Sequence, residues 1–122
     1  MLNSRNILTI TLEDLVEELS QRKARHPKAT RVVIAGRREQ TRRVLDAIAE
    51  GVVVEQRWRT IGSERLVTNE GVWVQLASSS SGALRGLSAD LVVLLGDERT
   101  VEAQLPDAAL VVLVRQGRVV LL

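Results

Sequence analysis

Four carboxylates in the C-terminal third of the sequence are the side chains with the clearest potential for chemistry: Asp90, Asp97, Glu98 and Glu102. Asp97 and Glu98 follow an apolar run, where carboxylates can hold a hydrated Mg²⁺ beside a phosphate. The four residues, however, are not spaced as a recognisable metal site. An Asp-Glu pair after a strand also suits the start of a helix, where negative charge meets the positive end of the helix dipole. We favour this structural role for Asp97 and Glu98.

A triphosphate site needs more than these carboxylates. The pattern G-x-x-x-x-G-K-[ST], whose backbone amides and lysine hold the phosphates, does not occur in the sequence. The sequence has no cysteine and a single histidine, His26, which argues against a thiolate or histidine metal centre. We therefore expect no enzymatic activity, no metal and no cofactor.

A basic cluster between Arg22 and Arg43 is the second candidate for function. It holds nine basic residues against Glu39 alone, so it would attract the phosphate backbone of a nucleic acid. Arginine is also common on solvent-exposed helix faces. The alternative is therefore that the basic cluster is an ordinary solvated surface that binds no ligand. The nucleic-acid-binding candidates are Arg37, Arg38, Arg42 and Arg43, together with Arg85 on a later loop.

The length of 122 residues is typical of one domain, and we expect residues 1–122 to form a single α/β unit. The N-terminus lacks the features of a signal peptide, and no apolar run approaches the roughly 20 residues of a membrane span. We therefore expect a cytoplasmic protein without membrane contact.

Hydrophobic periodicity predicts how the elements position these candidates. Alternation of strands and helices favours a mainly parallel sheet, and the Asn69-Glu-Gly71 turn favours an added hairpin. Trp73 is expected in the core, whereas Trp58, between Arg57 and Arg59, is a candidate for stacking on a base. The expected elements are a strand at 7–10, a helix at 12–25, a strand at 31–35, a helix at 38–50, strands at 52–54, 64–68, 72–77 and 90–95, a short helix at 99–105 ended by Pro106, and an apolar hairpin at 110–122 turning at Gln116-Gly117.

The order of features from Thr30 to Glu98 resembles the middle of the ATPase domain of phage large terminase subunits and related superfamily 2 helicases. The segment 31–48 is similar to motif Ia of that family, and a hairpin with an Asn-x-Gly turn follows. Arg85-Gly86, Ala89-Asp90 and Asp97-Glu98 then occupy the places of the loop and strand that lead to its Walker B motif. The resemblance implies a small three-layer sandwich with a degenerate P-loop NTPase-like core.

Two departures separate the chain from an active motor. Leu95-Gly96 lengthens the approach to Asp97-Glu98, and the N-terminal strand and helix carry no phosphate loop. We therefore expect a non-catalytic, phage-type protein that binds a protein partner or assembles with itself, with the apolar segment 110–122 as a possible pairing edge. If the protein is phage-encoded, its compartment would be the host cytoplasm. The alternative is a nucleic-acid-binding module that uses the basic cluster.

Overall fold

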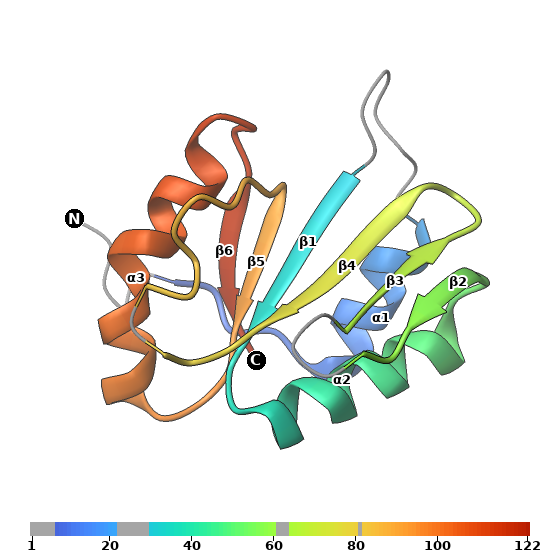
Figure 1. Cartoon of the computed structure of the whole chain (residues 1–122), viewed down its shortest axis with the longest axis horizontal. Helices are drawn as coiled ribbons and strands as arrows, with labels where there is room; N and C mark the ends of the chain where they lie inside the picture. Colours follow the sequence, from blue (N-terminus) through green and yellow to red (C-terminus); the bar gives the residue numbers. More distant parts are fainter. Residues whose placement is uncertain (1–6, 22–29, 61–63, 81) are drawn as a thin grey trace.

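The computed structural model describes residues 7–21, 30–60, 64–80 and 82–122. Within these ranges the chain forms a small mixed α/β domain with one six-stranded sheet (Figure 1). The elements are α1 (Leu12–Gln21), β1 (Thr30–Ala35), α2 (Arg38–Gly51), β2 (Val54–Trp58), β3 (Arg65–Thr68), β4 (Val72–Ala77), β5 (Leu91–Leu94), α3 (Glu98–Leu113) and β6 (Arg118–Leu121).

The sheet has the strand order β2-β3-β4-β1-β5-β6. Strands β4, β1, β5 and β6 are parallel neighbours, whereas β2 and β3 extend the sheet by antiparallel pairing beyond β4. The predicted hairpin around Asn69-Glu-Gly71 is confirmed, and Gly71 adopts the positive φ of 82° that the turn needs. The prediction that 52–54 continues the parallel sheet is wrong, because β2 begins at Val54 and lies antiparallel at the edge.

Helices α1 and α2 cover one face of the sheet, and α3 covers β5 and β6 on the other (Figure 1). The apolar runs of β1 and β5 are buried from both sides, which explains why they lack alternation. On α2 the buried residues include Val44, Leu45 and Ile48, as predicted. The C-terminal end of α2 lies close to α1: a Cβ on Gly51 would come within 2.1 Å of Cγ1 of Val16.

The first helix begins as its sequence predicts. The Oγ1 atom of Thr11 accepts a hydrogen bond of 3.1 Å from the amide of Asp14, which satisfies one free donor of the first turn. The described part of α1 ends at Gln21, so the predicted continuation to 25 lies outside the described residues. Before α1, the predicted strand at 7–10 is reduced to a single parallel bridge between Thr9 and Leu121.

Two predictions for the C-terminal third are wrong. Helix α3 does not stop at Pro106 but continues to Leu113. Proline removes one backbone hydrogen bond, yet Pro106 is exposed while Val101, Leu105 and Ala108 are buried against the sheet, so packing holds the helix together. The segment 110–122 is not a hairpin: it contains the end of α3, a turn, and β6, which runs parallel to β5. In the part of the chain that the structure describes, no helix has the length and apolar character needed to cross a membrane.

Candidate functional site

A crevice opens where the parallel strands β1 and β5 end. From β1 the chain turns into α2 on one face of the sheet, and from β5 it turns into α3 on the other. Neighbouring parallel strands whose connections leave toward opposite faces create a crevice beyond their carboxyl ends, and ligands of open α/β sheets bind at this position. The cavity has a volume of about 500 Å³.

One wall of this crevice comes from α2. Arg37, Gln40, Arg43 and Val44 line it, and their spacing of three or four residues places them along one side of the helix. Arg37 is the N-cap residue of α2, and its side chain makes no capping hydrogen bond. The first-turn amides of α2 therefore lack the side-chain acceptor that an Asp or Ser would supply, at the end of the helix that attracts anions.

The opposite wall comes from the turn between β5 and α3. Leu95, Gly96, Asp97 and Thr100 line it, and Leu122 adds an apolar contact. The Oδ1 atom of Asp97 accepts a hydrogen bond of 2.8 Å from the backbone amide of Thr100, so Asp97 caps α3. The backbone and side-chain hydrogen bonds from Thr100 lower the pKa of the Asp97 carboxyl, and the charges of Arg37 and Arg99 lower it further.

The two carboxylates of the Walker B-like remnant thus have different positions. Asp97 lies three residues beyond the end of β5 as the N-cap of α3, and Glu98 is the first residue of that helix and is exposed. Among the described residues, no group of three or more His, Cys, Asp or Glu side chains could hold a metal ion.

Arg38 and Arg42 lie on another side of α2 and face Glu64. Nε of Arg38 is 3.5 Å from Oε1 of Glu64, and Nε of Arg42 is 3.3 Å from Oε2. The Glu64 side chain is only 5% exposed, whereas the two arginines are about half exposed. Much of the charge of Arg38 and Arg42 therefore balances a buried carboxylate. Arg38 and Glu64 border a second cavity, of about 440 Å³, which Gly36 and Thr41 also line.

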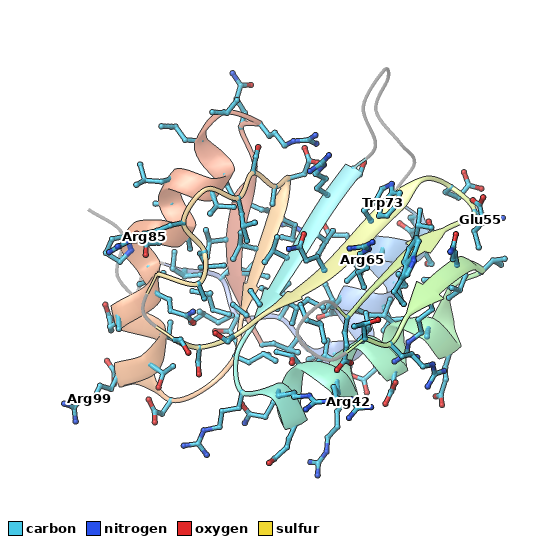
Figure 2. All side chains as sticks on the ribbon, viewed as in Figure 1. Arg42, Glu55, Arg65, Trp73, Arg85 and Arg99 are labelled. Atoms are coloured by element: carbon cyan, nitrogen blue, oxygen red, sulfur yellow. The ribbon has the colours of Figure 1, made fainter. Side chains whose placement is uncertain are left out.

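The remaining basic candidates are not in the crevice. Arg85 is on the loop between β4 and β5, and its Nε is 3.6 Å from Oδ2 of Asp107 on α3. Figure 2 shows Arg85 beside α3, whereas Arg42 on α2 and Arg99 at the start of α3 lie at the lower end of the molecule. Of the other five basic residues of the cluster, Arg31 is on β1, and the remaining four are outside the described residues: Arg22, Lys23, Arg25 and Lys28.

Several residues of this region were not among the candidates from the sequence. Gln40 and Thr100 line the crevice, and Glu64 holds two of the candidate arginines. Gln40 shares its helix side with Arg37 and Arg43 at helical spacing, so a helical projection of 38–50 could have found it. Glu64 is the only acidic residue between Glu55 and Glu70, but this isolated position does not indicate by itself that Glu64 pairs with arginines of α2.

The fold and the crevice define the class: a small mixed α/β domain with an arginine-bearing crevice at a topological switch point. A scan against protein-family models found no matching family, and a search of curated proteins found no match.

Proposed function

We propose that this chain is a non-catalytic nucleic-acid-binding module and that it holds the phosphate backbone in the crevice between α2 and α3. The observation that carries the proposal is the convergence of Arg37, Arg43 and the N-terminus of α2 on one cavity of about 500 Å³. Arginine and free helix amides are both donors that favour phosphate oxygens. The side chains that line the crevice include two arginines and one carboxylate, that of Asp97, whose Oδ1 atom accepts the Thr100 amide.

We also propose that the fold is a degenerate, three-layer relative of the motor domains of phage terminases and helicases. The parallel strands β4, β1, β5 and β6, with α1 and α2 on one face and α3 on the other, support it. Thr11 alone connects Ile10, which pairs with Leu121, to the first residue of α1. A phosphate loop of about eight residues has no room in that connection, which supports a binding rather than a hydrolytic role.

Neutralising both crevice arginines tests the proposal. We expect Arg37→Gln/Arg43→Gln to weaken binding of a fluorescein-labelled DNA duplex at low salt by about tenfold or more, because two charge-assisted phosphate contacts are lost. Fluorescence anisotropy measures the affinity. The control is Arg118→Gln, which removes a positive charge at the start of β6; because β6 is parallel to β5, this residue lies at the amino ends of the strands, away from the crevice. Equal affinities of the crevice variant and the control would refute the proposal.

A second candidate function, binding of a protein partner or self-assembly, is favoured by a different surface. Leu110, Leu113 and Val114, at the end of α3, are 66%, 68% and 85% exposed, and their spacing places them on one side of the helix. This strip replaces the apolar hairpin that was predicted for the same residues. We expect light scattering to show a mass that rises with protein concentration and that falls to the monomer in Leu113→Asp. A strict monomer over the whole concentration range would exclude self-assembly.

A further inference from the structure

None of the described helices covers β2, β3 and β4 on the sheet face that carries α3. Side chains on the two faces alternate along these strands. Leu66 and Val74 point to the side of α1 and α2, where they belong to the buried core. Their neighbours Arg65, Trp73 and Gln75 point to the other side, and all three are exposed. Figure 2 shows Arg65 and Trp73 on this open side.

Two tryptophans and an arginine form an ordered stack on the open face. The rings of Trp58 and Trp73 have centroids 5.6 Å apart and an interplanar angle of 16°. The guanidinium carbon of Arg65 lies 4.6 Å from the centroid of the Trp58 ring. Such contacts fix the orientation of flat side chains and reduce the entropy that a ligand would have to remove on binding.

Trp73 remains 37% exposed in this stack. A cavity of about 230 Å³ lies beside it, and its lining includes Arg31, Arg65, Trp73, Gln75 and Ser88. The prediction that Trp73 belongs to the core is therefore wrong. A large aromatic side chain that borders an open cavity between two arginines has the features of a base-stacking position.

The charge of this face selects the ligand. The residues of β1, β3 and β4 that point to it include Arg31, Arg65 and Gln75 and no acidic residue. On β2, Gln56 points to it, and Glu55 lies at the register shift between Val54 and Gln56. Gln75 also lines the next cavity, which Arg38 borders, so a chain lying along β4 would pass from Trp73 toward α2. Bases of a duplex stack on one another, whereas unpaired bases expose their faces for stacking on aromatic side chains.

We propose that the open face of β2, β3 and β4 binds single-stranded nucleic acid, with a base stacked on Trp73 and phosphates held by Arg31 and Arg65. This inference rests on the proposed function in naming nucleic acid as the ligand, but it concerns a different surface and a different form of nucleic acid. The chemistry fits DNA and RNA equally, so the experiment includes both.

The test measures the affinity of labelled oligo(dT) and oligo(U) by fluorescence anisotropy. Trp73→Ala is expected to weaken binding about 5- to 150-fold, the range that loss of one base–aromatic stack produces. Trp73→Phe retains a ring and should restore most of the affinity. Since Trp73→Ala also removes a contact with Trp58, Arg65→Gln provides a second variant that leaves both rings in place, and it should weaken binding as well. Circular dichroism checks that each variant is folded.

The same titrations separate this inference from the proposed crevice. Unchanged affinity for both oligonucleotides in Trp73→Ala and Arg65→Gln overturns the inference, even if Arg37→Gln/Arg43→Gln weakens duplex binding as proposed. Weaker single-strand binding in Trp73→Ala, with unchanged duplex binding in the crevice variant, supports the inference and refutes the crevice. Absence of single-strand binding by the wild type also overturns it. A difference between oligo(dT) and oligo(U) identifies the preferred polymer.

Discussion

Replacing Asp90 with alanine is expected to lower the free energy of unfolding by about 3 kcal/mol, because it removes a carboxylate that accepts hydrogen bonds from a backbone amide and from a largely buried guanidinium. The Oδ2 atom of Asp90 accepts a hydrogen bond of 2.8 Å from the amide of Arg31 and one of 2.7 Å from Nη1 of Arg115. The side chains of Asp90 and Arg115 are only 11% and 16% exposed. Denaturant unfolding monitored by circular dichroism gives the change directly.

Two variants sharpen this measurement. Asp90→Asn keeps an acceptor for the Arg31 amide and should cost less than Asp90→Ala. Asp107→Ala removes an acidic residue from a pair with Arg85, which is 73% exposed, and should change stability by about 0.5 kcal/mol or less. If Asp90→Ala and Asp107→Ala lowered the free energy of unfolding by equally small amounts, the stabilising role of Asp90 would be refuted. The resemblance to motor ATPases places Asp90 in the strand that leads to the Walker B motif, whereas its contacts with Arg31 and Arg115 indicate a structural role.

The double variant Arg38→Gln/Arg42→Gln is expected to lower the free energy of unfolding by about 2 to 3 kcal/mol, because Glu64 is left buried without its two cations. Adding Glu64→Gln removes the unbalanced charge and should recover most of that loss. The recovery is measured as a coupling energy in a mutant cycle. Additive effects of the three substitutions would show that the buried carboxylate does not depend on these arginines.

Arg37→Gln/Arg43→Gln is the matched control for this cycle, because it removes the same number of charges from the same helix. Its arginines are exposed and line the crevice, so its effect on stability should stay within about 0.5 kcal/mol per substitution. The two pairs therefore divide the basic face of α2: Arg38 and Arg42 support the fold, and Arg37 and Arg43 are available to a ligand.

Most of the local structure could be predicted from the sequence where pattern and packing agree. The buried strands β1 and β5 are short continuous apolar runs, and α2 has a regular apolar stripe that ends at Gly51. The hairpin from β3 to β4 follows from its turn residues. Each of these elements is specified by neighbours within a few residues.

The incorrect predictions concern elements whose structure depends on contacts with residues far away in the sequence. Proline and a run of aliphatic residues predicted that α3 would stop early and that a hairpin would follow, but the burial of α3 against β5 and β6 outweighs the lost hydrogen bond at Pro106. Residues 118–121 pair with β5 in parallel, and this partner has no local signal. The edge position of β2 likewise depends on its pairing with β3.

For the candidate site, the sequence predicted the residue types but not their partners. The basic cluster made Arg37 and Arg43 nucleic-acid-binding candidates without predicting the crevice that they line, and it grouped them with Arg38 and Arg42, which face Glu64. The helical positions separate the two pairs, but only the tertiary structure brings Glu64 to one side of α2 and the β5–α3 turn to the other. The exposure of Trp73 has the same origin, because α3 covers another part of that sheet face.

The salt dependence of duplex binding tests the central claim, phosphate binding in the crevice, most directly. The logarithm of the association constant falls linearly with the logarithm of the salt concentration, with a slope of about −0.9 for each phosphate contact on duplex DNA. The crevice predicts that Arg37→Gln/Arg43→Gln has a slope shallower than the wild type by about 1.8, whereas Arg118→Gln remains parallel to the wild type. Identical slopes for the wild type and the crevice variant would contradict phosphate binding by Arg37 and Arg43.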